Sequence, residues 1–118
     1  MAKRGDDFAR GYVPQRGDIV HLNWDPSVGH EMNGPHYGLV LSQNIFNVGT
    51  GFILVSPITS KQGKLSGFEF PVQAGRVQGV VVLSEVRTID YQNRNIQFEG
   101  VVQPELVEEA CRRVKMVL

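Results

Sequence analysis

One polar segment of the sequence combines side chains that could transfer protons. It reads Gly29-His30-Glu31-Met32-Asn33-Gly34-Pro35-His36, with two imidazoles and one carboxylate among turn-forming residues. Imidazole can donate or accept a proton near neutral pH, and loops held by a rigid sheet commonly carry functional sites. His30, Glu31 and His36 are therefore candidate catalytic residues. A solvated polar loop would have the same composition, and local chemistry alone favours that simpler interpretation.

A second candidate group lies where an apolar segment ends at Thr59 and Ser60. Lys61 and Lys64 follow closely, so hydroxyl and ammonium groups could face a phosphate together. Threonine and serine more often satisfy hydrogen bonds within turns, and composition alone favours that role.

Two further polar side chains lie within predicted strands. Arg87 stands beside Glu85 and near Asp90, so an internal ion pair is the first expectation and phosphate binding the second. His21 lies in the middle of a predicted strand. We expect it to be a packed or surface histidine rather than a catalytic one.

Motifs of several enzyme classes are absent from the sequence. The three histidines are not spaced with carboxylates or a cysteine pair in a zinc-binding pattern. There is no glycine-rich phosphate loop with a lysine and no nucleophile elbow. The sequence therefore predicts neither a metal site nor a bound cofactor.

Short apolar and alternating segments predict most of the secondary structure. The predicted strands cover 17–25, 37–42, 52–58, 67–72, 79–83 and 86–90. The third strand is expected to break near Pro57, and the fourth to lie at a sheet edge because Pro71 is excluded from central strands. A short helical turn is expected over 43–49 and a polar loop over 59–64.

The hydrophobic period changes near the C-terminus. Pro104 suits the first position of a helix, and apolar residues then recur at helical spacing. Leu106, Ala110, Val114 and Val117 are expected to form its buried stripe. Strands followed by one helix predict a mainly β, α+β fold or a small barrel.

Composition limits the class of protein. The chain has 118 residues, 42% of them hydrophobic, and a formal net charge of zero, so it lacks the basic bias of general nucleic-acid binders. One cysteine, Cys111, cannot form an internal disulfide and fits a reducing compartment. No apolar run approaches the ~20 residues of a membrane helix. We expect a flexible lead-in over 1–11 without a signal peptide, a single domain over 12–118 and a cytoplasmic location.

Several ordered motifs from about Tyr12 to the C-terminus match a known family. They are Arg16-Gly17-Asp18-Ile19-Val20, Asp25-Pro26-Ser27-Val28-Gly29-His30-Glu31, Leu39-Val40-Leu41-Ser42, Val55-Ser56-Pro57-Ile58-Thr59-Ser60, Gly79-Val80-Val81-Val82-Leu83 and Val86-Arg87-Thr88-Ile89-Asp90. In this order and spacing the sequence resembles the MazF/PemK/ChpB toxins, and its later half is most similar to the ChpB and PemK branches.

The resemblance implies both a fold and an activity. The fold is a small, twisted, barrel-like antiparallel sheet of the MazF/PemK/CcdB type with a C-terminal helix, acting as a homodimer. The implied activity is that of a type II toxin, inhibited by a MazE/PemI-like antitoxin, which cleaves single-stranded mRNA without metal. In the family's transesterification the ribose 2′-hydroxyl attacks the adjacent phosphate, which requires a base, an acid and positive charge.

The resemblance also implies roles for particular residues. Thr59 matches the family's catalytic-site threonine, Glu31 its loop glutamate and His30 the loop histidine of the PemK branch. His36 stands where the family usually has a catalytic arginine followed by proline. We therefore predict His36, Thr59, Glu31 and His30 as catalytic residues. Ser60, Lys61, Lys64 and Arg87 are the predicted RNA-binding residues.

Four positions depart from the family pattern and leave alternatives open. Besides His36, Met32 replaces a glutamine, and Val82 and Ser84 replace an arginine and an aspartate of the PemK branch. One alternative is a catalytically weakened member that binds RNA or antitoxin. Another is a gyrase-binding toxin of the CcdB type, which shares the fold. The Gly-His-Glu loop and Thr59 favour the ribonuclease.

Overall fold

The computed structural model describes residues 11–60 and 67–118. Seven strands, two α-helices and two short 3₁₀ segments make up this part of the chain. In chain order they are β1 (Asp18–Asn23), β2 (Pro35–Val40), α1 (Asn44–Thr50), β3 (Phe52–Thr59), β4 (Glu69–Ala74), β5 (Val77–Val82), η2 (Leu83–Glu85), β6 (Arg87–Asp90), η3 (Tyr91–Asn93), β7 (Gln97–Val101) and α2 (Pro104–Lys115).

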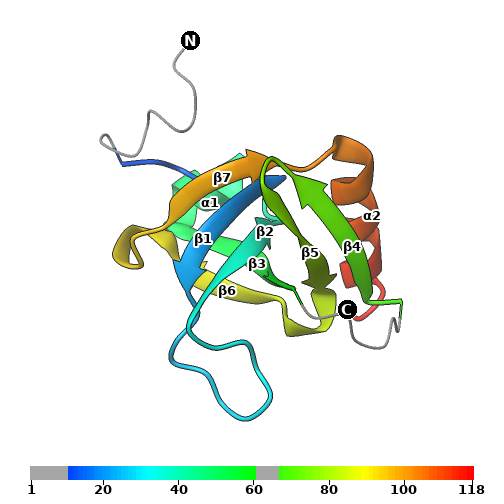
Figure 1. Ribbon diagram of the computed structural model, residues 1–118. Coiled ribbons are helices and arrows are strands. Elements are labelled where there is room, and N and C mark those ends of the chain that lie inside the picture. Colours follow the sequence, from blue (N-terminus) through cyan, green and yellow to red (C-terminus); the bar gives the residue numbers. More distant parts are fainter. Residues whose placement is uncertain (1–10, 61–66) are drawn as a thin grey trace.

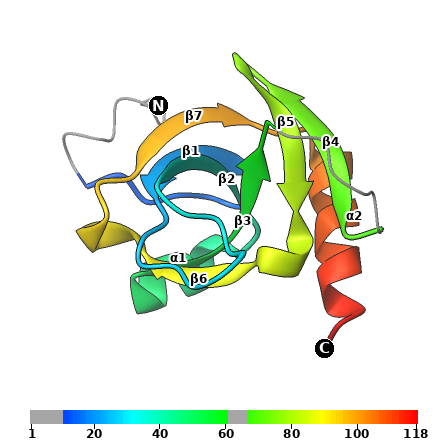
Figure 2. The same ribbon diagram turned by 60° about the horizontal axis from the view of Figure 1, so that its bottom comes forward.

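The strands form one strongly curled antiparallel sheet (Figure 1). Its order is β4-β5-β3-β2-β1-β7, and β6 pairs with β3 beyond the end of β5. Figure 2 shows the sheet curving round so that β7 arches over β1, while α2 lies beside the β4–β5 hairpin. The twisted barrel-like fold with a C-terminal helix is therefore confirmed.

Both faces of the central strands are buried, which explains their continuous apolar runs. Ile19 and Leu39 belong to a cluster that also includes residues of β4, β5 and α2. Their neighbours Val20 and Val40 belong to a second cluster, on the opposite face, with Trp24 and Ile89 among its members. Successive side chains of a strand point to opposite faces, so β1 and β2 supply alternate residues to each cluster.

Gly38 of β2 lets the Trp24 ring of the second cluster pack directly against the backbone of this strand. A Cβ atom at this position would lie 2.7 Å from Val55 Cγ2 and 2.8 Å from Trp24 Cζ2. Both contacts are far shorter than van der Waals distances, so any larger residue would push the indole away from the sheet. The absence of a side chain at Gly38 therefore fixes where Trp24 lies.

The C-terminal helix begins at Pro104 as predicted, but its buried face differs in detail. Val107 and Ala110 are the buried residues of α2, and they pack in the first cluster. Leu106 and Val114 are only half-buried. Val117 was predicted to belong to the stripe, but this prediction is wrong: the helix ends at Lys115 and leaves the Val117 side chain 63% exposed.

The predicted break at Pro57 is also wrong, because β3 continues through it to Thr59. Pro57 pairs with Gly38 on the β2 side. On the other side of β3, the pairing with β6 extends up to Val55, and the pairing with β5 begins at Ile58. Pro57 thus lies where the sheet changes partners, a place where a residue without an N–H group is tolerated.

Other boundaries follow the sequence patterns with small shifts. The helical turn expected over 43–49 is α1, which ends at Thr50 and is capped by Gly51, whose φ is 76°. The edge position predicted for the strand containing Pro71 is confirmed, since β4 ends the sheet. β7 was not predicted, because Phe98 is half-buried and no residue of this strand is fully buried.

Within the described ranges, none of the helices is long and apolar enough to cross a membrane. The predicted lead-in over 1–11 lies almost entirely outside the described residues.

Candidate active site at the end of β2 and β3

Two predicted catalytic residues come together through strand register. The pairing of β2 with β3 joins Tyr37 to Ile58 as its last pair. One residue further, the same antiparallel register places His36 opposite Thr59, and directly opposite residues project to the same face. His36 had been predicted within the polar loop, but it belongs to β2, where it pairs with Leu22 of β1.

Trp24 lies on the face of the sheet that carries His36 and Thr59, and its hydrogen bonds connect β2 with β6. Its Nε1 atom donates a hydrogen bond of 3.3 Å to the carbonyl oxygen of His36. An Arg87 guanidinium nitrogen donates one of 3.1 Å to the Trp24 carbonyl oxygen, and the guanidinium carbon lies 6.0 Å from the centre of the indole ring. Arg87 is half-buried on β6, opposite Val55 of β3. The indole therefore holds a cation beside the face that carries His36 and Thr59.

The ion pair expected for Arg87 is wrong within the described residues. The Glu85 carboxylate instead accepts from the Met32 backbone amide, and the Asp90 carboxylate accepts from the Gln92 amide and from the side chain of Asn93. Arg87 is directed by the Trp24 carbonyl group rather than by a carboxylate. Because Arg87 forms no ion pair with a carboxylate of the described residues, its charge can act on a bound anion.

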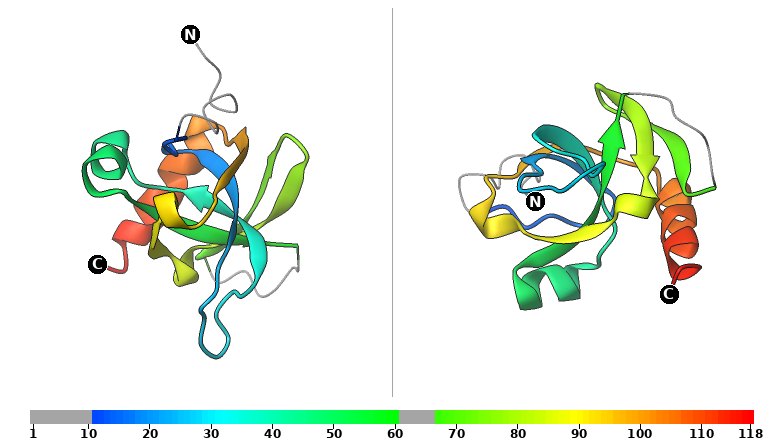
Figure 3. Two further views of the ribbon diagram at one scale, coloured as in Figure 1. Left: turned by 90° about the vertical axis from the view of Figure 1, so that its left-hand side faces the viewer. Right: turned by 90° about the horizontal axis from the view of Figure 1, so that it is seen from below.

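The loop between β1 and β2 carries His30 and Glu31 and projects beyond the end of the sheet (Figure 3, left). Its base is closed by a hydrogen bond from the Trp24 amide to the Gly34 carbonyl oxygen, 2.9 Å long. The Met32 amide donates to Glu85 Oε1 at 2.6 Å, which attaches the loop to η2. Glu31 Oε1 accepts from the Val28 amide at 2.8 Å. Hydrogen bonds at both ends therefore give the loop a defined position.

A cavity of about 170 Å³ lies between this loop and the sheet. Glu31 and Met32 line it from the loop, Pro57 from β3 and Arg87 from β6. With Glu85 as a further lining residue, it brings two carboxylates and one guanidinium to the face that carries His36 and Thr59. A group of this kind could hold a phosphodiester, with a cation for its charge and proton-transfer groups nearby.

Other predicted residues lie elsewhere or outside the described part of the chain. His30 is exposed on the loop. Ser60 follows Thr59 but lines a different cavity, formed with β4, β5 and the start of α2. Successive strand residues point to opposite faces, which explains why Ser60 and Thr59 are separated. Lys61 and Lys64 lie outside the described residues.

Trp24 and Glu85 help to build the candidate site, but the sequence analysis does not predict this role for either residue. Trp24 was assigned only to the end of a strand, and Glu85 only as a neighbour of Arg87. Both act through contacts distant in sequence: Glu85 binds the Met32 amide 53 positions away. Their contacts depend on tertiary pairing, and no local pattern in the sequence indicates it.

Comparisons with known proteins relate this arrangement to characterised families. Residues 15–118 match the family of PemK-like, MazF-like toxins of type II toxin–antitoxin systems. The endoribonuclease toxin ChpB of Escherichia coli K12 is 39% identical over 109 residues, which cover 88% of this chain and 93% of ChpB.

Two solved structures from Deinococcus radiodurans share the fold. MazF has a TM-score of 0.81 and 32% identity, covering 90% of this chain and 96% of MazF. A MazE–MazF complex matches with a TM-score of 0.75 and 27% identity, over 90% of this chain and 95% of the matched chain. The match to the family model extends over most of the chain. This chain therefore belongs to the family of PemK-like, MazF-like toxins of type II toxin–antitoxin systems.

Proposed function

We propose that this protein is an endoribonuclease that cleaves single-stranded mRNA as the toxin of a type II toxin–antitoxin pair. The observation that supports the proposal is the register of β2 and β3, whose extension by one residue beyond the Tyr37–Ile58 pair brings His36 opposite Thr59. Arg87 and Glu31 line the cavity beside that face. The endoribonuclease ChpB, 39% identical to this chain, supports the same activity.

The proposed reaction is an internal transesterification. The ribose 2′-oxygen attacks the adjacent phosphorus while a base takes the 2′-hydroxyl proton, and the bond from phosphorus to the 5′-oxygen breaks. An acid gives a proton to that leaving oxygen. The products are a 2′,3′-cyclic phosphate and a free 5′-hydroxyl, and DNA is spared because it lacks the attacking group.

Each candidate residue has a proposed part in this reaction. His36 supplies a proton or positive charge, since imidazole can do either. Thr59 donates its hydroxyl hydrogen to a phosphate oxygen, and Arg87 stabilises the developing negative charge. Glu31 is the proposed base, with His30 on the same exposed loop as the second proton-transfer group. The reaction as proposed uses only these side chains and needs no metal ion.

The rest of the RNA strand is proposed to contact residues that follow Thr59. Lys61 and Lys64 come within a few positions of it and carry the charge that RNA phosphates attract. Ser60 is proposed to contact the strand from the neighbouring cavity that it lines.

We propose that the protein forms a homodimer in the cytoplasm and is inhibited by a MazE/PemI-like antitoxin. The MazE–MazF complex of similar fold supports the antitoxin partner. Exposed apolar side chains on the described surface, among them Ile45 and Val48 of α1, offer area that a partner could cover. Light scattering of the isolated protein should give twice the chain mass.

One observation favours a second candidate function. His36 stands at the end of β2 where the resembled family usually has arginine, so the chain could bind RNA without cleaving it efficiently. Incubation of the protein with a long unstructured RNA separates the two functions. The ribonuclease yields discrete fragments that the Thr59→Ala variant does not produce, whereas the binding function shifts the RNA on a native gel and leaves it intact.

A further inference from the structure

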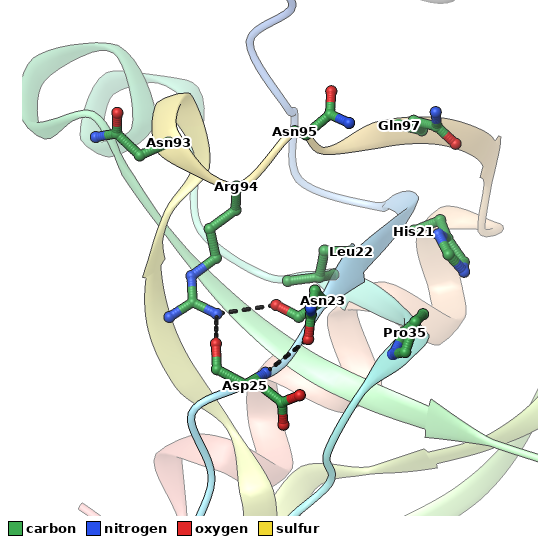
Figure 4. Close-up of a pocket in the computed structure, with 9 residues that line it drawn as sticks. All are labelled: His21, Leu22, Asn23, Asp25, Pro35, Asn93, Arg94, Asn95 and Gln97. Carbon is green, nitrogen blue, oxygen red and sulfur yellow. Dashed lines mark hydrogen bonds between the residues drawn. The ribbon is translucent and has the colours of Figure 1, made fainter.

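A larger cavity lies on the other side of the base of the β1–β2 hairpin. Its volume is about 760 Å³, and it shares no lining residue with the cavity beside Arg87. Figure 4 shows its wall, which β1 forms together with the segment that joins η3 to β7. His21, Asn23, Asn95 and Gln97 supply an imidazole and three amide groups to this wall, whereas the Asn93 amide donates to the Asp90 carboxylate.

Two of these side chains are placed together by the sheet. His21 of β1 pairs directly with Gln97 of β7, so both project from the same face. The His21 ring also packs edge-on against Tyr37, with 5.1 Å between ring centres. The imidazole and the Gln97 amide therefore form one polar end of the cavity, and Tyr37 supports the imidazole from behind.

Hydrogen bonds hold the opposite wall in place. An Arg94 guanidinium nitrogen donates to the Asn23 carbonyl oxygen at 2.9 Å and also to the Asp25 carbonyl oxygen (Figure 4). The Asn23 side-chain oxygen accepts from the Asp25 amide at 2.9 Å. Asn95 has φ of 51°, a left-handed conformation that asparagine tolerates better than most residues. The cavity is thus a preformed site.

The chemistry of the lining fits a nucleobase better than a phosphate. The Arg94 cation is engaged with the Asn23 and Asp25 backbone carbonyl groups, and the Asp25 carboxylate adds a negative charge to the lining, which disfavours a phosphate. Amide and imidazole groups each combine hydrogen-bond donors with acceptors, as base edges do. Proteins recognise single-stranded RNA by such bonds to splayed-out bases.

The cavity also lies next to the proposed catalytic face. Pro35 lines it and is followed directly by His36, and Leu22, which lines it too, pairs with His36 across the hairpin. Leu22 and His36 project to one face of the hairpin and His21 to the other, so an RNA strand whose phosphate lies between His36 and Thr59 would reach this cavity by bending around the end of the hairpin.

We propose that this cavity binds one unpaired base of the RNA next to the scissile phosphate and sets the cleavage sequence at that position. In this arrangement the amide oxygens of Asn95 and Gln97 accept from an exocyclic amino group of the base, so a base that carries one is preferred over uracil. This inference rests on the proposed ribonuclease function and adds to it the residues that recognise one base of the RNA.

The test compares cleavage of a randomised single-stranded RNA library by wild type and two variants, with cut sites identified by sequencing. Gln97→Ala removes one amide, and His21→Phe keeps a ring against Tyr37 but removes its nitrogens. Gln92→Ala is the matched control, because this exposed amide lies near the same turn but does not line the cavity.

The proposal predicts that wild type prefers an amino-bearing base at one position next to the cut. Gln97→Ala and His21→Phe should each reduce that preference about tenfold or more, and Gln92→Ala should not. A preference that both variants leave unchanged, or an equal loss of cleavage for all four bases, would overturn the base-binding site. A wild-type protein that leaves the library intact would instead contradict the proposed function itself.

Discussion

The backbone amide of Met32 donates a hydrogen bond of 2.6 Å to the carboxylate of Glu85. This bond attaches the loop that carries His30 and Glu31 to the short 3₁₀ segment before β6. Glu85 lines the cavity together with Glu31 and Arg87. We infer that Glu85 is a positioning residue, which keeps the loop over the sheet.

Replacement of Glu85 by alanine should release the loop and reduce kcat/KM for RNA cleavage about tenfold, because small displacements of reacting groups are costly. Hydrogen exchange of the Met32 amide should become faster in the same variant. Glu85→Gln keeps an acceptor oxygen and should retain most of the activity and protection. Unchanged exchange at Met32 in Glu85→Ala would show that other contacts hold the loop.

Gly38→Ala tests the packing of Trp24 on the sheet. The added methyl group would lie 2.7–2.8 Å from atoms of Val55 and Trp24. Overpacking of this kind typically costs about 1–3 kcal/mol, so thermal unfolding should begin several degrees lower. Gly49→Ala is the control: no atom lies within 4 Å of its added Cβ, and alanine favours the helix α1. Equal melting temperatures for the two variants would contradict the packing account.

The C-terminal helix carries an acidic residue with a strongly lowered pKa. Hydrogen bonds from Arg112 and Arg113 lower the pKa of Glu109 from 4.5 to about 2. Arg113 also donates to the Gly67 carbonyl oxygen before β4 and lies over the Phe70 ring. Glu109 therefore holds an arginine that attaches α2 to the sheet.

A lowered pKa in the folded state stabilises the fold above pH 4.5, and this contribution is lost as the pH falls towards about 2. Glu109→Gln should therefore lower the melting temperature slightly at pH 7, since its ion pairs with Arg112 and Arg113 lie at a partly exposed surface, where such pairs are weak. The difference from wild type should shrink in melts at pH 3 and below. A difference that grows on acidification would contradict this assignment.

His36 is the position where arginine would normally be expected in the family. If its imidazole donates a proton or positive charge, His36→Ala should cleave RNA at least about a hundredfold more slowly. His36→Arg keeps a cation at this position and should remain active. An alanine variant that cleaves at the wild-type rate would show that His36 only packs at the end of β2.

Local patterns were sufficient to predict most strands, the C-terminal helix and the edge position of β4. Each of these depends on apolar runs, proline positions or a change of period within a short segment. β7 was missed because Phe98 and its neighbours are only partly buried, so this strand has little hydrophobic signal. The predicted break at Pro57 was wrong because a strand can contain proline where no neighbouring strand needs its N–H group, and the sequence does not show which strands pair there.

The candidate site was less predictable than the fold. His36 and Thr59 were selected from the family resemblance, but only the β2–β3 register places them opposite each other. Arg87 was expected to bind a carboxylate, although the Trp24 carbonyl group directs it. Such pairings join residues distant in sequence, and a single sequence contains no signal for them.

We propose that RNA is cleaved by its own 2′-hydroxyl on the face formed by His36 and Thr59. End-group analysis of the RNA products formed in excess chelator by wild type, Thr59→Ala and Thr88→Ala distinguishes this route from metal-dependent hydrolysis. Thr88 is the matched control, an exposed strand threonine that projects away from Arg87's face. Wild type and Thr88→Ala should yield 2′,3′-cyclic phosphate and 5′-hydroxyl ends, with Thr59→Ala about a hundredfold slower or more. Products with 5′-phosphate ends, or cleavage abolished by chelator, would contradict the account.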